Sequence, residues 1–429
     1  MRKVKLTFFL VVVTFFTVEN HLHSQLLTFY PFNSTIDTMD MSPGIKGPYY
    51  SYVGEYRKAL SLLELDPTVR REHPLNTIDS SYLKGFQAQL AKKYILKKAD
   101  NKQIMIFNEN HGNSRHRLFV KSILEELYDL GYRSLGLEGL SRFPPGNEEN
   151  LNSRGYEIVN PKLPFIGYTA EPQFGELIRE ALSIGYYVYS YERVQGDFEG
   201  EVNPYSERML LTKDIQARNI VRKIFDKDPD AKTILYCGWG HCIESEQQWS
   251  HNYGKSKWMA SFLKDLTGIN PYTVNQALLS ERFKFSPNPF YSLLEEEREN
   301  LPGEGRGEPL VFVNEKGQGF NPNSYFSVDL YVYHPSTKYI NGRPDWLTYQ
   351  ENHEIYPLSG LEIGGTSFPL KVIAQVAGEE KMAIPVDVME VRNEQELISK
   401  ALVLKEGRKY RVSIFSMEGK LKDFEVDIN

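Results

Sequence analysis

The stretch IMIFNENHG, residues 104–112, indicates the fold most directly, because four apolar residues are followed at once by five polar or small ones. The apolar part predicts a short buried strand, and the polar part predicts the turn that leaves it. Downstream, apolar residues recur at three- and four-residue spacing at Phe119, Ile123, Leu124, Leu127 and Leu130. This spacing predicts one helix that begins near Asn113 or Ser114 and ends at Gly131, before a second strand over 134–137.

The same alternation of short apolar runs and amphipathic stretches continues for five β/α repeats in all. Further strands are expected over about 186–191, 233–237 and 272–277, and helices over about 171–184, 206–225 and 257–267. Two later apolar runs, 310–313 and 328–333, are candidates to extend the sheet. These repeats predict an α/β fold with a mainly parallel sheet flanked by helices.

The pattern changes after about residue 356, where polar and apolar residues alternate without a helix between the runs. This alternation predicts a small C-terminal antiparallel β domain. We therefore expect four parts: a signal peptide at 1–24, an N-terminal helical or irregular segment at 25–98, an α/β domain at 99–355 and the β domain at 356–429.

The first residues predict export. Arg2, Lys3 and Lys5 precede an apolar stretch over 6–18, which is typical of a cleaved secretory signal peptide, and the mature chain would begin near Gln25. That stretch is too short to span a bilayer comfortably, and no later segment has enough consecutive apolar residues to do so. We expect a secreted or periplasmic protein without a membrane span.

Composition limits the partners. The 429 residues are 41% hydrophobic and 25% charged, with a formal net charge of -6, which is ordinary for a globular protein. The chain has no basic block after its first residues, so we expect no nucleic-acid partner and favour a small-molecule or peptide substrate. Only Cys237 and Cys242 could form a disulfide. An exported protein permits that pairing, but we favour free, partly buried thiols because the bridge would need a tight turn.

Polar residues follow almost every predicted strand, and ligands of open parallel sheets bind at these carboxyl ends. The residues in these places are Glu109 and His111, then Glu138, Glu192, His241 and His334. Carboxylates and imidazoles that converge on one rim can bind a divalent ion and activate water, or act as general acid and base.

Each of these residues also has a plainer interpretation. Polar side chains at a strand-to-helix turn often cap the helix or face solvent, Glu192 could pair with Arg193 or Arg179, and His334 precedes Pro335 at a usual strand ending. The joint placement of Glu109, His111, Glu138 and His241 favours a functional site over four separate structural roles.

Four segments, IMIFNENHG (104–112), LGLEG (135–139), KDIQARNI (213–220) and TILYCGWGH (233–241), occur in an order that carries a family resemblance. The order is similar to that of the erythromycin-esterase, ChaN and Tiki/TraB superfamily, and nearest to its erythromycin-esterase-like members. The resemblance covers about residues 103–245. One departure is Asn108, which stands where the family has Gly and which tolerates a left-handed backbone better than most residues.

The resemblance implies that Glu109, His111, Glu138 and His241 form the site. It also implies that Lys213 and Asp214 are the equivalents of an Arg/Lys-Asp pair in the family, and we expect them to contact substrate together with Glu192 and His334. Members of the superfamily differ in activity: some hydrolyse a macrolide lactone, some resemble metal-dependent peptidases and some bind haem iron. The fold alone does not choose among these.

We favour an exported hydrolase in which His111 and His241, with Glu109 and Glu138, position and deprotonate water for attack on an ester, lactone or amide carbonyl. These four residues would suit Zn, Mn, Co or Fe, but the same groups can act as base and orienter without metal. The sequence has no Gly-x-Ser-x-Gly segment, which argues against the usual serine-esterase route.

Two other functions remain open. The alternative is a ChaN-like haem or metal-binding protein without turnover, for which Tyr191 and the Tyr-rich run 186–189 are candidates. The third is an interaction protein with a degenerate pocket. Cys237 and Cys242 flank His241 closely enough to be considered as nucleophiles, but the place of Cys237 within a predicted strand disfavours this.

Overall fold

The computed structural model describes residues 26–63, 80–140, 147–159, 168–193, 205–250, 254–282, 289–298, 307–322, 326–348, 350–361, 363 and 367–429. The predicted signal peptide at 1–24 lies outside these residues. Contacts divide the chain into two compact units. We call them the β unit (Met1–Leu62, Glu157–Gly175 and Lys338–Asn429) and the α/β unit (Leu63–Tyr156 and Glu176–Thr337).

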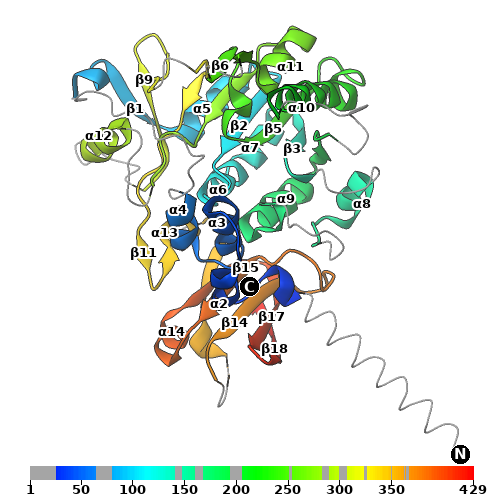
Figure 1. Cartoon of the computed structure of the whole chain (residues 1–429), viewed down its shortest axis with the longest axis vertical. Helices are drawn as coiled ribbons and strands as arrows, with labels where there is room; N and C mark the ends of the chain where they lie inside the picture. The colour runs from blue at the N-terminus through cyan, green and yellow to red at the C-terminus, as the bar shows by residue number, and fades with distance from the viewer. Residues whose placement is uncertain are drawn as a thin grey trace, which may run out of the picture. The chain divides into compact units, whose positions relative to one another are not determined.

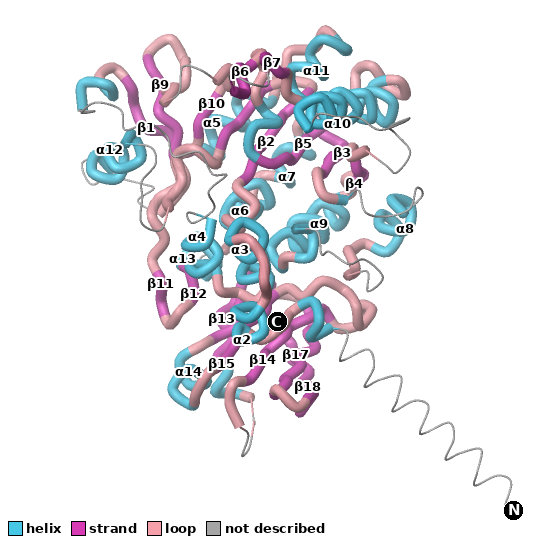
Figure 2. Tube along the Cα trace, viewed as in Figure 1, coloured by secondary structure: helices cyan, strands magenta, loops and turns pink. Residues whose placement is uncertain are grey.

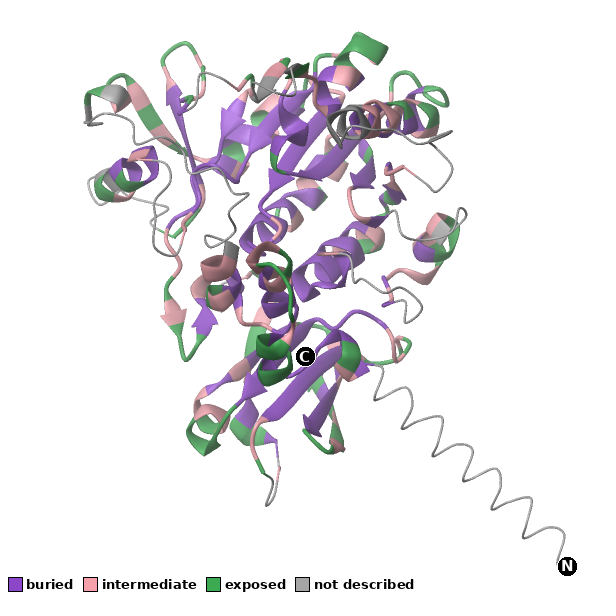
Figure 3. Cartoon of the chain, viewed as in Figure 1, coloured by how far each residue is buried: buried purple, intermediate pink, exposed green. Residues whose placement is uncertain are grey.

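The α/β unit is built on a six-stranded sheet in which every adjacent pair of strands is parallel (Figure 1). In order across the sheet the strands are β10 (Leu330–Tyr331), β8 (Tyr272–Asn275), β2 (Ile104–Glu109), β5 (Lys232–Gly238), β3 (Tyr132–Leu137) and β4 (Tyr187–Ser190). The central strands are almost wholly buried (Figure 3), as expected of a parallel sheet covered on both faces. This confirms the predicted fold class.

Helices cover both faces of this sheet. One face packs against α10 (Tyr205–Ile220), a π-helical turn at Val221–Phe225, and α11 (Met259–Thr267), through a core that includes Ile104 and Ile106. The other face carries α6 (Arg115–Lys121) and α7 (Leu124–Asp129) (Figure 2). The sequence predicts these last two as one helix, but the chain turns at Ser122, whose hydroxyl donates 2.7 Å to the carbonyl of Phe119. Gly131 has a φ of 96° and so ends the second helix as predicted.

The run 310–313 lies outside the six-stranded sheet, whereas the run 328–333 contributes its edge strand, β10. Strand β9 (Leu310–Asn314) instead pairs antiparallel with β1 (Phe86–Leu90). A separate apolar cluster, which includes Leu310, Phe312 and residues of α12 (Pro289–Arg298), covers it. Other elements of this unit are η1 (Ser80–Leu83), α5 (Ala91–Ala99), α8 (Asn147–Arg154), η5 (Trp239–Cys242), β6 (Gln247–Ser250) and β7 (Gly254–Ser256).

The β unit contains the predicted antiparallel C-terminal sheet. Its strands, in order, are β15 (Asp387–Val391), β14 (Leu370–Val376), β17 (Arg408–Ser416) and β18 (Gly419–Ile428), and β13 (His353–Pro357) pairs with β16 (Ala401–Lys405). The shorter elements are η3 (Tyr168–Ala170), β11 (Tyr339–Ile340), β12 (Arg343–Pro344), α13 (Asp345–Thr348), η6 (Leu358–Gly360) and α14 (Glu394–Ser399). Helix α9 (Pro172–Ile184) begins in this unit and ends in the other.

The N-terminal helices belong to the β unit, so the division differs from the expected parts at 25–98 and 356–429. Helices α2 (Asn33–Thr38), α3 (Pro43–Tyr52) and α4 (Tyr56–Leu63) supply residues to a core that also contains Ile373 and Phe415. The other face of the same strands packs in a second core with Val372 and Ile414. Because both faces of β14 and β17 are apolar, the sheet needs cover from a distant part of the chain.

Two polar contacts join distant segments of this unit. Arg343 and Asp387 form a buried ion pair with an Nη2–Oδ2 distance of 2.6 Å, and the backbone amide of Asn33 donates 2.7 Å to Glu390. No helix among the described residues has the length and apolar character needed to cross a membrane.

Candidate active site

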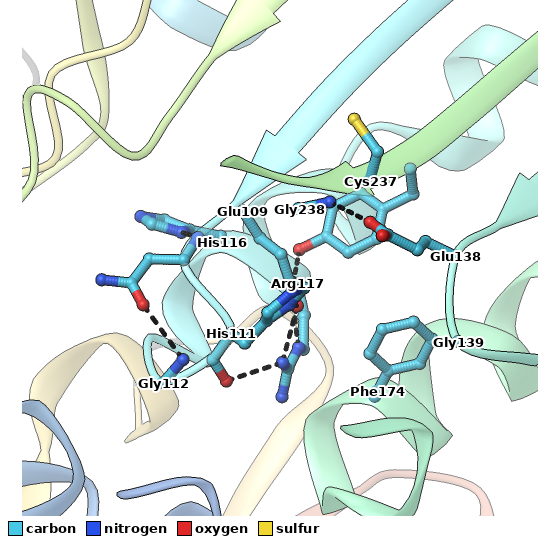
Figure 4. A network of polar contacts seen from close by, with 12 residues as sticks. Glu109, His111, Gly112, His116, Arg117, Glu138, Gly139, Phe174, Cys237 and Gly238 are labelled. Atoms are coloured by element: carbon cyan, nitrogen blue, oxygen red, sulfur yellow. Dashed lines mark hydrogen bonds and ion pairs between the residues drawn. The ribbon is translucent and has the colours of Figure 1, made fainter. Parts of the chain in front are cut away.

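Glu109 ends strand β2 and is almost completely buried, with 1% of its surface exposed. Its two carboxylate oxygens contact three side chains, those of Arg117, Tyr236 and His111 (Figure 4). Arg117 donates through Nε at 2.7 Å and Nη2 at 2.8 Å, and the hydroxyl of Tyr236 donates at 2.7 Å. Burial by itself would raise the pKa of Glu109, but the Arg117 guanidinium and the hydrogen bonds hold it well below its usual range. Glu109 is therefore an ionised, fixed acceptor.

The third partner of Glu109 is His111, whose Nδ1 lies 2.7 Å from Oε1 of the carboxylate. An ionised carboxylate at Nδ1 fixes the ring in the tautomer that carries its proton there, which leaves Nε2 as the basic nitrogen. The imidazole is 27% exposed, whereas Glu109 is closed off from solvent. The pair therefore has the form of an oriented general base.

Gly238, at the end of β5, brings His111 close to Glu138. A Cβ atom at position 238 would lie 2.6 Å from Nε2 of His111 and 3.2 Å from Oε2 of Glu138. Only glycine allows both side chains to approach the backbone at this point. The backbone amide of Gly238 also donates to Oε2 of Glu138 (Figure 4). His111 and Glu138 thus surround one small region at the rim of the sheet.

Glu138 directly follows β3 and lies with its Oε1 3.3 Å from Nε2 of His241. Burial opposes ionisation of this carboxyl, but His241, His111 and Lys213 together lower its pKa below the ordinary value. Glu138 is therefore ionised at neutral pH.

His241 lies beside Lys213, with a distance of 2.9 Å between Nε2 of His241 and Nζ of Lys213. Burial lowers the pKa of His241 to about 3 and also lowers the pKa of Lys213. A neutral His241 can accept a hydrogen bond from the Lys213 ammonium at Nε2 and carry its own proton on Nδ1, for which the described residues offer no hydrogen-bond partner. Trp258 covers both groups, with its ring 5.6 Å from the imidazole and 5.4 Å from the ammonium.

Glu192 follows β4 and is a second carboxyl beside Glu138. Gln216 donates 3.1 Å to its Oε2, and the amide of Gly139 donates 3.3 Å to its Oε1. Burial, followed by the charge of Glu138, raises the pKa of Glu192 to about 7. Two neighbouring carboxyls whose pKa values are displaced in opposite directions are a recurring arrangement in acid–base catalysis.

The structure thus brings together Glu109, His111, Glu138, Glu192, Lys213 and His241, but it places Asp214 and His334 elsewhere. Asp214 pairs with Arg218 one turn along α10, at 2.9 Å. His334 is buried, with Nε2 3.1 Å from Oε1 of Gln276 and its ring 5.1 Å from that of His116. Both residues have local structural partners rather than the substrate-facing positions expected from the sequence.

Arg117 and Tyr236 are the site residues that the sequence analysis missed. Arg117 is fully buried in α6, but in the sequence it directly follows Arg115 and His116, and nothing in this polar run signals its burial. Strand β5 is buried almost throughout, so its sequence gives no hint of the contact that Tyr236 makes with Glu109.

Asn108 is extended in strand β2 and is not left-handed. Its Nδ2 donates 2.7 Å to the carbonyl of Trp239, and its Oδ1 accepts from the amide of Gln276 at 2.7 Å. Asn108 therefore ties the ends of three neighbouring strands together, where glycine would make neither bond.

The donor set does not fit a divalent ion as it is arranged. The carboxylate of Glu109 already accepts from Arg117, Tyr236 and His111, and Nε2 of His241 faces the Lys213 ammonium, where a metal would have to lie. Among the described residues, no three His, Cys, Asp or Glu side chains form a group that could hold a metal ion.

The other candidate groups are engaged within the core. Cys237 and Cys242 are free, buried thiols, and burial raises the pKa of Cys242 to about 12 and that of Cys237 well above its ordinary value, which does not suit a nucleophile. The hydroxyls of Tyr186, Tyr189 and Tyr191 lie 2.7, 3.2 and 2.8 Å from partners within the unit. These tyrosines pack in the interior and do not form a haem-binding rim.

Neither the known protein families nor the curated proteins include a match to this chain. Among solved structures, the type III effector HopBA1 aligns at 12% identity over 49% of this chain and 88% of its own, with a TM-score of 0.29. RRSP, a MARTX toxin effector domain from Vibrio vulnificus, aligns at 14% identity over 54% and 44% of the two chains, with a TM-score of 0.29. The C-terminal region of Pasteurella multocida toxin, described with a thiol-protease-like catalytic triad, aligns at 8% identity over 82% and 53%, with a TM-score of 0.31. At these scores the similarity carries no argument about activity.

Proposed function

We propose that this protein is a hydrolase in which His111 acts as general base and activates water for attack on an ester, lactone or amide carbonyl. The observation that carries the proposal is the Glu109–His111 pair, with its 2.7 Å contact and its buried support from Arg117 and Tyr236. An imidazole oriented by a fixed carboxylate is a recurring arrangement in general-base catalysis.

Water would bind between Nε2 of His111 and the carboxylate of Glu138, which both lie close to Gly238. Two acceptors can hold the two hydrogens of one water, and this directs an oxygen lone pair toward the carbonyl carbon. As the bond forms, the water proton passes to Nε2 of His111, and the ionised Glu109 stabilises the resulting imidazolium.

Glu192 would serve as the general acid. With a pKa raised to about 7 by burial and by Glu138, its carboxyl retains a proton to give to the leaving oxygen or nitrogen near neutral pH. Lys213 supplies a buried positive charge close to Glu138 and His241. These steps use only groups of the chain, which is consistent with a donor set that does not suit a metal.

The order of segments that resembles the erythromycin-esterase superfamily supports the same class of reaction, because the four residues it implies lie in one cluster. We extend the proposal to an exported enzyme on the strength of the N-terminal segment. Intact-mass measurement of secreted protein should then give a mature chain that begins near Gln25.

The experiment that tests the proposed function is a hydrolysis assay on p-nitrophenyl acetate, a macrolide lactone and a dipeptide p-nitroanilide, before and after dialysis against a chelator. We expect turnover of at least one substrate, unchanged by the chelator, and a loss of roughly 100-fold or more in His111→Ala. Equal rates in His111→Ala and the unaltered protein would refute the role of His111. A rate abolished by the chelator and restored by a metal would refute the metal-free site.

A further inference from the structure

Trp239 has an unusual combination of exposure and backbone geometry. It follows β5 directly, its φ is 28°, and 36% of its surface is exposed. A bulky residue at positive φ is an outlier, and such strain concentrates at active sites and ligand clamps. The fold itself does not explain why an exposed tryptophan is held in a strained conformation.

The neighbours of Trp239 explain why its side chain faces outward. On one side Gly238 is packed against His111, and on the other side a Cβ at Gly240 would lie 2.6 Å from the Trp258 ring. Both flanking positions therefore turn their backbone toward the site and leave room for no side chain. Nδ2 of Asn108, in strand β2, donates a 2.7 Å hydrogen bond to the carbonyl of Trp239, and this bond helps to fix the backbone conformation.

Trp239 is next in the chain to the residue that contacts the proposed base. One peptide unit separates it from the glycine that contacts the imidazole of His111. The guanidinium of Arg282 lies 5.7 Å from the centre of the indole ring, a cation–π contact that orients the indole. An exposed aromatic surface thus lies one residue along the chain from the glycine that packs against His111.

We propose that Trp239 is a substrate-binding residue that stacks against an aromatic or flat apolar group attached to the carbonyl that is hydrolysed. This rests on the proposed function for the position of the carbonyl, but the binding itself needs no turnover. Stacking of this kind adds to the area that the indole buries, and its loss should weaken binding by roughly 2- to 10-fold.

The test measures equilibrium binding of 2-naphthol, which contains no ester and cannot be hydrolysed, to the full-length protein by equilibrium dialysis. Trp239→Gly suits the positive φ, so the protein should remain folded, as thermal unfolding checks, while its Kd for 2-naphthol should rise by roughly 2- to 10-fold. Trp239→Phe, which keeps an aromatic face, should retain most of the affinity. Tyr187→Ala is the matched control, because Tyr187 is 37% exposed but lies at the amino end of β4, whereas Trp239 follows the carboxyl end of β5.

Weaker binding in Trp239→Gly, with unchanged binding in Tyr187→Ala, supports the inference. Equal affinity in Trp239→Gly and the unaltered protein overturns it, as do equal losses in both variants or no binding of 2-naphthol to the unaltered protein at millimolar concentration. The proposed function fails separately, if His111→Ala still hydrolyses substrate, whatever the Kd for 2-naphthol is.

Discussion

Glu138 and Glu192 follow neighbouring strands, β3 and β4, and their environments displace their pKa values in opposite directions. Glu138 is kept ionised by His241, His111 and Lys213, whereas burial and the charge of Glu138 hold the pKa of Glu192 at about 7. Two carboxyls at one rim therefore differ in protonation at neutral pH, and this difference assigns the acid in the proposed reaction.

The alkaline side of the pH–rate profile should report Glu192. A general acid with a pKa of about 7 loses its proton as the pH rises, so kcat/KM should fall above about pH 7. Glu192→Gln should lower kcat by roughly 100-fold and remove this fall, because glutamine neither donates nor loses a proton. A profile for Glu192→Gln that keeps the same alkaline fall would contradict the assignment.

Glu192→Gln should also change how the stability of the protein depends on pH. A carboxyl whose pKa is raised on folding binds its proton more tightly in the native state, so its contribution to stability is lost as the pH rises from about 4 through 7. Glu192→Gln should therefore be more stable than the unaltered protein at pH 8 and similar to it at pH 4, as measured by urea unfolding.

Glu109→Gln should reduce stability as well as activity. It leaves the fully buried guanidinium of Arg117 without its charged partner, which typically costs about 3–5 kcal/mol of unfolding free energy. Because the pKa of Glu109 is lowered on folding, this contribution is present above about pH 4 and is lost as the pH falls further. Urea unfolding at pH 7 measures the loss. Glu125→Gln, on the exposed side of α7, is the control and should change the unfolding free energy by less than about 0.5 kcal/mol.

Substitutions of Lys213 and Asp214 should have very different effects on kcat, although the two residues are adjacent in the sequence. Lys213→Met removes the charge beside Glu138 and His241, and kcat should fall by roughly 100-fold. Asp214→Asn affects only an exposed pair with Arg218 and should leave kcat within about twofold. Steady-state kinetics on any substrate that is turned over decides the matter, and equal effects of the two changes would refute the placement of Lys213.

The C-terminal sheet should not fold alone. A fragment of residues 357–429 exposes Ile373, Val388 and Phe415, which the N-terminal helices cover in the whole chain. We expect this fragment to unfold without a cooperative transition and to bind a hydrophobic dye. Cooperative thermal unfolding of the fragment, followed by circular dichroism, would mean that the sheet is an independent domain, as the sequence pattern suggests.

The rim of the sheet could be predicted from the sequence because the ends of buried strands are visible as changes from apolar to polar residues. Glu109, His111, Glu138 and His241 all lie at such ends. His334 also follows a strand, but β10 is the edge strand, and β8 and β2 separate it from β5. The strand order, which short apolar runs do not encode, decided which residues converge.

Tertiary packing also explains the other differences between the site expected from the sequence and the site in the structure. Adjacent helical residues point about 100° apart, so Lys213 faces His241 while Asp214 faces Arg218. The contacts of Arg117 and Tyr236 with Glu109 join residues from a helix and from another strand, and no local pattern predicts them. The sequence also suggests exposed rim residues, whereas 1% of Glu109 and 6% of His241 are exposed, because their hydrogen-bond partners lie around them.

The most direct test of the central claim is chemical rescue of His111→Ala by imidazole on a substrate that the unaltered protein hydrolyses. The side chain is 27% exposed, so added imidazole can reach the space it leaves. We predict a loss of roughly 100-fold or more in His111→Ala, partly restored by imidazole above the rate of imidazole alone. Unreduced turnover in a folded His111→Ala protein would contradict the claim that His111 is the general base.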